Sequence, residues 1–94
     1  MELKAIKAFI KSDNDYKLTK VSSKRPNSCV DVDTRYVGTP KLFDFSGGET
    51  GLRIYGRGFD FMQTSPIVKV LDQTDSVLMF ETEGGVYRLE KGSV

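Results

Sequence analysis

Three short apolar runs, separated by two polar turns, stand out in the last third of the chain, residues 64–91. Short apolar runs bounded by Asp, Thr and Gly are typical of β-strands joined by tight turns. The near-continuous apolar run at 77–82 further predicts burial on both faces of its strand. The pattern therefore predicts a three-stranded antiparallel meander, with strands at 67–71, 77–82 and 86–90 and turns at 72–75 and 83–85.

The middle of the chain predicts further strands. Residues Cys29–Val37 alternate apolar and polar side chains, which predicts a half-buried strand that ends at Gly38-Thr39-Pro40. A turn at 46–48 separates the apolar residues around Phe43 from a short strand at 52–55. Gly56 and Gly58 then predict a bend or a close backbone approach.

The first 22 residues leave two interpretations open. As a helix, residues 1–11 place Leu3, Ile6 and Ile10 on one stripe. As a strand, residues 3–11 would form a hairpin with residues 16–22 across a polar turn. Periodicity does not decide between a helix and a strand in so short a run.

Together these elements predict a mostly β fold, or an α+β fold if the N-terminus is helical. Ninety-four residues correspond to one domain, 1–94, built as a small antiparallel β-barrel or a strongly bent sheet. The predicted core comprises the apolar residues on the inner side of each element: Ile6, Leu18, Val30, Val32, Leu52, Ile54, Val68, Val70, Leu78, Phe80 and Leu89.

Composition and charge limit the classes of partner that the protein is expected to bind. The net charge of +1 generates no global field that would attract nucleic acid or an anionic membrane. Residues 1–25 nevertheless carry seven Lys or Arg against three Asp or Glu, whereas residues 72–94 carry two against five. We expect these two ends to face each other or water; a basic binding patch is the alternative. No apolar run is long enough for a signal peptide or a membrane span, so a cytoplasmic protein without membrane contact is expected.

Little in the sequence indicates catalysis. The chain has no histidine, and its single cysteine, Cys29, lacks the usual base and cannot form an internal disulfide. Asp31 and Asp33 would share one strand face, where a carboxylate pair can hold Mg²⁺ or share a proton. No third ligand accompanies them, and Arg35 on that face can compensate their charge. We therefore expect no enzymatic activity, no metal and no cofactor.

One short motif has a functional parallel. Residues 57–61, RGFDF, resemble the first ribonucleoprotein motif of RNA recognition domains, which implies bases stacked on aromatic rings of a sheet. Tyr36-Val37-Gly38 resembles the partner motif on the first strand of such domains. Asp60 departs from the motif, however, and Arg57 follows Val37 by only 20 positions, too few for the helix and strand that lie between the two motifs in that fold. We expect instead a glycine-bent strand whose Phe59 and Phe61 enter the core.

A binding surface is the remaining candidate. Arg53, Tyr55 and Arg57 would share one face of a straight strand, with Phe59 beyond them. Arginine and tyrosine are enriched at interface hot spots, and basic residues around an aromatic ring also suit single-stranded nucleic acid.

We therefore expect a non-enzymatic protein-binding module, such as a small regulator or inhibitor that docks on a larger protein. Its sheet edges would also permit strand addition or homo-oligomers. A single-stranded nucleic-acid-binding protein is the alternative function. Short chains of this kind are common in phages and mobile elements, although no residue indicates that origin.

Overall fold

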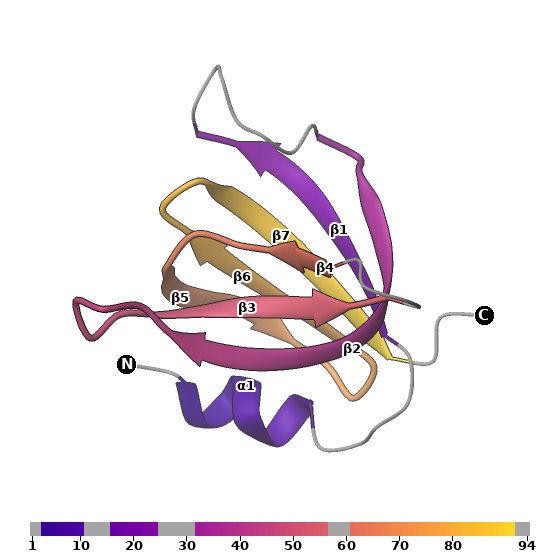
Figure 1. Cartoon of the computed structure of the whole chain (residues 1–94). Coiled ribbons are helices and arrows are strands. Elements are labelled where there is room, and N and C mark those ends of the chain that lie inside the picture. Colours follow the sequence, from indigo (N-terminus) through magenta and orange to yellow (C-terminus); the bar gives the residue numbers. More distant parts are fainter. Residues whose placement is uncertain (1–2, 11–15, 25–31, 57–60, 92–94) are drawn as a thin grey trace.

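The computed structural model describes residues 3–10, 16–24, 32–56 and 61–91. It is mostly antiparallel β-structure with one short helix, as predicted (Figure 1). Its elements are α1 (Leu3–Phe9), β1 (Tyr16–Ser23), β2 (Arg35–Asp44), β3 (Thr50–Tyr55), β4 (Phe61–Gln63), β5 (Ile67–Gln73), β6 (Val77–Thr82) and β7 (Gly85–Lys91).

The strands form one bent sheet in the order β4-β3-β2-β1-β7-β6-β5. The C-terminal meander is confirmed, because β5, β6 and β7 are successive antiparallel neighbours. The sheet folds over so that β3 approaches β5, and α1 lies across one end of the space between its two halves (Figure 1). The N-terminal alternatives are thus decided in favour of a helix, and β1 pairs with β2 and β7.

The bend of the sheet lies in β2. Its first part, Arg35–Gly38, pairs with β1, and its second part, Thr39–Asp44, pairs with β3. A Cβ atom on Gly38 would lie 2.0 Å from the Tyr55 carbonyl oxygen, so only glycine permits this approach of β2 to β3.

The predicted strand end at Gly38-Thr39-Pro40 is wrong, because β2 continues through these residues. Pro40 lies opposite Ile54, at a position where the β2 N–H does not point towards β3. Its missing N–H therefore removes no hydrogen bond between β2 and β3, which makes proline tolerable here. The strand also begins later than predicted: Val32 and Asp33 form a turn, and residues 29–31 lie outside the described residues.

The core lies between the two halves of the sheet and under α1. Ile6 and Phe9 of the helix are buried, and the Tyr16 hydroxyl donates to the Phe9 carbonyl oxygen at 3.0 Å. Seven predicted core residues are confirmed and fully buried: Ile6, Leu18, Leu52, Ile54, Leu78, Phe80 and Leu89. Val70 is partly buried against them, and Val30 lies outside the described residues.

Two predicted core residues are wrong. Val32 is 44% exposed because it lies in a turn rather than a strand. Val68 is 45% exposed because β5 shifts register against β6 between Ile67 and Lys69, which interrupts its alternation. The turn predicted at 72–75 also starts later, since β5 continues to Gln73. In β6 burial alternates, so its second face is only half-buried rather than enclosed as predicted.

Candidate functional site

The outward face of β2, β3 and β4 gathers an arginine and four aromatic side chains. Strand register places Lys41 beside Arg53 and Arg53 beside Gln63, while Tyr55 lies beside Phe61. Phe43 lies one pair further along β2, and Phe45 follows the end of that strand. We call Phe43, Phe45, Arg53, Tyr55, Phe61 and Gln63 the aromatic–arginine surface.

Arg53 is the centre of this surface. Its guanidinium carbon lies 4.6 Å from the Phe43 ring centroid, 4.8 Å from that of Phe61 and 5.9 Å from that of Tyr55. Nη1 donates to the Tyr55 hydroxyl at 3.1 Å, and Nη2 donates to Gln63 Oε1 at 2.7 Å. Cation–π contacts and two hydrogen bonds therefore hold the guanidinium group in one position.

Gly51 makes room for the aromatic residues at the other end of the surface. Phe43 and Phe45 pack with their ring centroids 4.7 Å apart. A Cβ atom on Gly51 would lie 2.8 Å from the Phe45 ring and 3.0 Å from the Phe43 ring. The absence of a side chain at Gly51 thus lets both rings lie close to β3.

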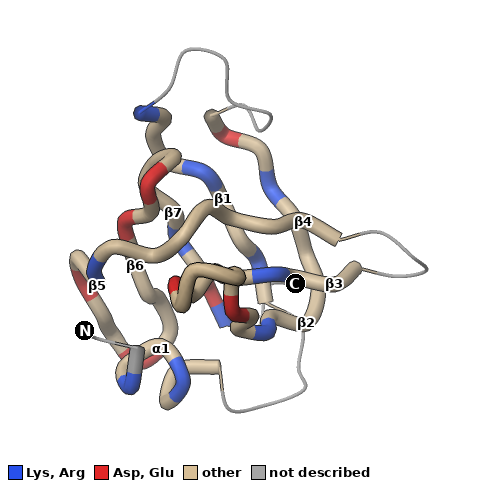
Figure 2. Tube along the Cα trace, turned by 60° about the vertical axis from the view of Figure 1, so that its left-hand side comes forward, with Lys and Arg blue, Asp and Glu red and all other residues tan. Residues whose placement is uncertain are grey.

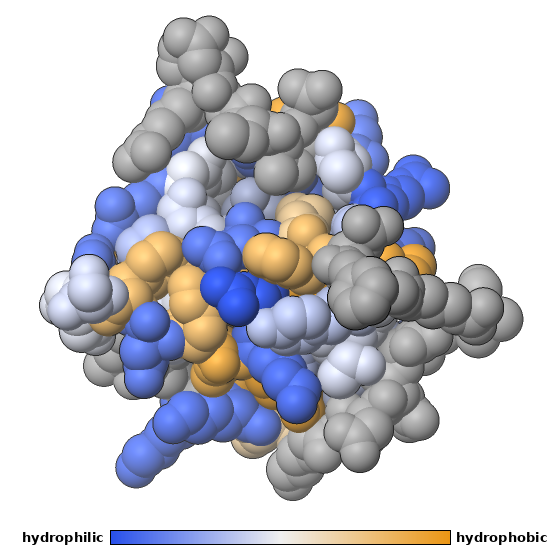
Figure 3. Space-filling view, in the orientation of Figure 1, coloured by the Kyte–Doolittle hydropathy of each residue, from blue (hydrophilic) through white to orange (hydrophobic). Residues whose placement is uncertain are grey.

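Part of the surface is exposed to solvent, while Phe43, Phe45 and Arg53 are half-buried. Tyr55 is 39% exposed and Phe61 is 50% exposed, with their ring centroids 5.8 Å apart. Figure 3 views the molecule from the side where β2, β3 and β4 are in front, and apolar and hydrophilic surfaces alternate across its centre. Exposed aromatic groups that gather on one face mark interaction sites more often than singly scattered ones do.

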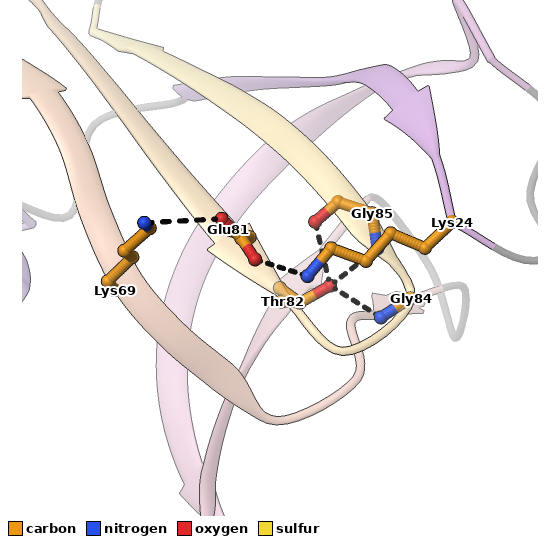
Figure 4. A network of polar contacts seen from close by, with 6 residues as sticks. All are labelled: Lys24, Lys69, Glu81, Thr82, Gly84 and Gly85. Atoms are coloured by element: carbon orange, nitrogen blue, oxygen red, sulfur yellow. Dashed lines mark hydrogen bonds and ion pairs between the residues drawn. The ribbon is translucent and has the colours of Figure 1, made fainter.

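The opposite half of the sheet has a different chemistry. Basic and acidic positions lie close together along β1, β6 and β7 (Figure 2). The ion pairs on this half join Lys17 to Glu90 at 3.5 Å, Lys69 to Glu81 at 3.9 Å, Arg88 to Glu90 at 3.1 Å, and Lys24 to Glu81 (Figure 4). Lysines of the basic N-terminal region thus face acids of the C-terminal region, as expected.

Carboxylate pKa values follow from these contacts. The hydrogen bond from Lys24 lowers the pKa of Glu81 below its ordinary value. Near the β2–β3 turn, a hydrogen bond with Glu83 and the charge of Glu83 raise the pKa of Glu49. Burial raises the pKa of Tyr87, whose ring lies beside the fully buried Lys20.

Two of the predicted binding residues are brought together. Arg53 and Tyr55 share one face and contact each other, whereas Arg57 and Phe59 lie outside the described residues. The prediction that Phe61 enters the core is wrong, since alternation along β4 directs Met62 inward and Phe61 outward.

Sequence reasoning missed the contributions of Phe43 and Gln63. Both residues reach the surface because β2 and β4 pair with β3. For Phe43 the only signal in the sequence was its place next to Leu42, since adjacent strand residues face opposite sides of a sheet.

Only Asp33 of the predicted carboxylate pair lies within the described residues. Asp33 lies in a turn with φ 70° rather than in a strand, and Asp31 lies outside the described residues. In the part of the chain that the structure describes, no group of three or more Cys, Asp or Glu side chains could hold a metal ion.

No protein-family model, curated protein or solved structure matches the chain. Within the described ranges, no helix is both long and apolar enough to cross a membrane.

Proposed function

We propose that this protein is a non-enzymatic protein-binding module that docks on a larger protein through the aromatic–arginine surface. The observation that carries the proposal is the position of Arg53, held by rings and hydrogen bonds within an exposed aromatic patch. Tyrosine and arginine are among the residues that most often dominate the energy of protein interfaces.

Preorganisation supports this function. A free arginine side chain loses much rotamer entropy when a partner immobilises it. Arg53 is already ordered by Phe43, Phe61, Tyr55 and Gln63, so most of this entropy is lost on folding rather than on binding. A regulator or inhibitor that docks on its target would benefit from such a surface.

Single-stranded nucleic acid is the second candidate partner. Among the described strand residues, the outward positions of β2, β3 and β4 include Lys41 and Arg53 but no acidic residue. Interleaved cations and aromatic rings are typical of surfaces that bind single strands. However, the guanidinium group of Arg53 already covers the rings of Phe43 and Phe61, which leaves less ring area for bases to stack on.

Affinity capture from a host lysate tests the proposal. The tagged protein, Arg53→Ala and Arg88→Ala would be compared by mass spectrometry, with and without nuclease. Arg88 is a matched control because it is also a strand arginine but lies on the ion-paired half of the sheet. We expect a stoichiometric protein that resists nuclease, is lost with Arg53→Ala and is kept with Arg88→Ala.

Two other results would contradict the proposal. Equal capture by all three proteins would show that the aromatic–arginine surface is not the interface. Capture that disappears with nuclease and weakens steeply with rising salt would favour nucleic acid, because phosphate contacts release counterions.

A further inference from the structure

We propose that the free edge of β4 receives an extended, carboxylate-bearing segment of the protein partner, which adds to the sheet as a strand beside β4. This inference rests on the proposed function and specifies how the partner is bound. Strand addition uses main-chain hydrogen bonds for affinity and alternate side chains for specificity. The aromatic–arginine surface would then continue directly onto the side chains of the added strand.

The two edges of the sheet differ in their capacity to pair. The order of strands leaves β4 and β5 at the edges. β5 shifts register against β6 twice, between Ile67 and Lys69 and between Val70 and Asp72. Such bulges and the charged Lys69 are typical of edges protected against further pairing. The described β4 pairs with β3 without a register shift, so it is the regular edge.

Backbone directions in β4 follow from one hydrogen bond. The Thr64 N–H donates to the Leu52 carbonyl oxygen at 2.8 Å, so this pair is of the hydrogen-bonded kind. Because the two kinds of pair alternate along an antiparallel ladder, Met62 bonds to Ile54. The N–H and C=O groups of Phe61 and Gln63 therefore point away from β3, towards the free edge.

Side-chain contacts agree with this assignment. Pairs that are not hydrogen-bonded bring side chains closer together. Arg53 and Gln63 are 2.7 Å apart at their polar ends, and the Tyr55 and Phe61 rings are in contact. Among the described residues, no hydrogen bond to the edge-facing backbone groups of Phe61 and Gln63 is found.

The Gln63 amide indicates the chemistry of the incoming strand. Its Oε1 atom accepts from Arg53, so the Nε2 group is directed to the other side of the amide. This group is a donor that an acceptor on an added strand would satisfy. Lys41 and Arg53 add positive charge, and the outward positions of the described parts of β2, β3 and β4 carry no acidic residue. Aspartate or glutamate on the partner segment is the complementary choice.

Peptide binding to backbone and side-chain variants tests this inference. The probe is a dye-labelled decapeptide of alternating Glu and Val, compared with one of alternating Lys and Val, by fluorescence anisotropy. We expect Gln63→Pro, which removes an edge-facing N–H, to weaken binding of the acidic peptide about tenfold beyond Gln63→Ala. Leu71→Ala on the β5 edge serves as a control that leaves binding unchanged.

Amide hydrogen exchange on the unmodified protein gives a second test that does not depend on variant folding. Saturation with the acidic peptide should slow exchange of the Phe61 and Gln63 amides at least tenfold. Exposed amides of β5 should keep their rates, because that edge is not expected to pair.

Three results would overturn the inference. In the first, the Phe61 and Gln63 amides exchange at unchanged rates, and the acidic and basic peptides either bind equally well or do not bind. The second is slowing of these amides by a rise in protein concentration alone, which would identify a second copy as the occupant. The third is protection of the same amides by oligothymidylate but not by the acidic peptide.

Failure here is distinguishable from failure of the proposed function. If lysate capture depends on Arg53 but Gln63→Pro captures the same partner as fully as Gln63→Ala, the surface binds protein without strand addition. If capture is insensitive to Arg53→Ala, the proposed surface itself is wrong.

Discussion

Arg53 connects three strands through its side chain alone. It belongs to β3, stacks on Phe43 of β2 and Phe61 of β4, and donates to Gln63 on β4. Its Nε atom is buried and has no hydrogen-bond partner among the described residues, so the ring contacts and the two Nη bonds hold the group. A side chain with this many contacts should contribute to stability as well as to binding.

We predict that Arg53→Ala lowers the free energy of unfolding by about 1–2 kcal/mol, because two close cation–π contacts contribute roughly 0.5–1 kcal/mol each. Arg53→Lys should recover less than half of this loss, since an ammonium group cannot reproduce a planar stack with two directed hydrogen bonds. Urea denaturation of the three proteins measures the difference. Equal stability of the lysine variant and the original protein would show that charge alone matters.

Gly38 is the residue on which the bend of β2 depends. We predict that Gly38→Ala destabilises the protein by about 3 kcal/mol or more, because the new Cβ would overlap the Tyr55 carbonyl group. Gly47→Ala in the β2–β3 turn is the control, since its Cβ would meet only the end of the Glu49 side chain at 3.4 Å. Thermal unfolding of both variants checks this, and a similar melting temperature for the two would contradict the proposed strand contact.

Individual strands are stabilised by the side chains that alternate into the core. Phe80 in β6 is fully buried and stacks on Tyr87 with the ring centroids 5.7 Å apart, whereas Val68 in β5 is 45% exposed. We predict that Phe80→Ala lowers the free energy of unfolding by about 3–5 kcal/mol. Val68→Ala should change it by less than about 0.5 kcal/mol. A large effect at Val68 in urea denaturation would mean that β5 follows the regular register instead.

Turns and strand ends make stability depend on pH in two opposite ways. Lys24 lowers the pKa of Glu81 below 4.5, so the stability from this pair is present above pH 4.5 and is lost as pH falls through the lowered value. Glu83 raises the pKa of Glu49 above 4.5, so this pair favours the folded state below pH 4.5 and opposes it once pH rises through the raised value.

We therefore predict that at pH 7 Glu81→Gln lowers the melting temperature and Glu83→Gln raises it. Both differences should shrink towards pH 3, where the carboxylates become protonated in the folded and unfolded states. Melting curves at pH 7, 5 and 3 provide the measurement. A difference of the same sign for both variants would contradict the assigned contacts.

Local sequence patterns correctly predicted those strands for which the turn residues and the apolar runs indicate the same boundaries. The meander of β5, β6 and β7 was evident from polar turns between apolar runs, and β3 from its position between glycines. The full length of β2 was not evident from the sequence, because glycine and proline, here Gly38 and Pro40, normally mark strand ends. In this protein, Gly38 and Pro40 lie at a bend inside β2. Whether a strand can accommodate them depends on which neighbouring strand each residue faces, and this is decided only in the folded sheet.

The candidate surface was predictable only in part for the same reason. Arg53 and Tyr55 are two positions apart in one strand, so their shared face follows from alternation. Their contacts with Phe43, Phe61 and Gln63 cross strand boundaries and require the register of β2 and β4. The predicted burial of Val32 and Val68 was wrong for a similar reason. Alternation is interrupted by a turn at Val32 and by a register shift of β5 at Val68.

The molecule as a whole presents two contrasting faces. Acidic and basic side chains are paired on the half of the sheet formed by β1, β7, β6 and β5, and Lys17 and Lys24 of the basic N-terminal region belong to these pairs. The face of β2, β3 and β4 instead exposes aromatic rings around a fixed arginine. This division is the basis for the proposal that the second face binds a partner protein while the first faces solvent.

Hydrogen–deuterium exchange of the protein alone and in complex with its captured partner tests this division most directly. Our account predicts slower exchange in peptides that cover 39–55 and 61–64, with little change in peptides that cover 16–23 and 85–91. Protection concentrated in 16–23 and 85–91, with 39–55 and 61–64 unchanged, would contradict it and place the interface on the ion-paired face.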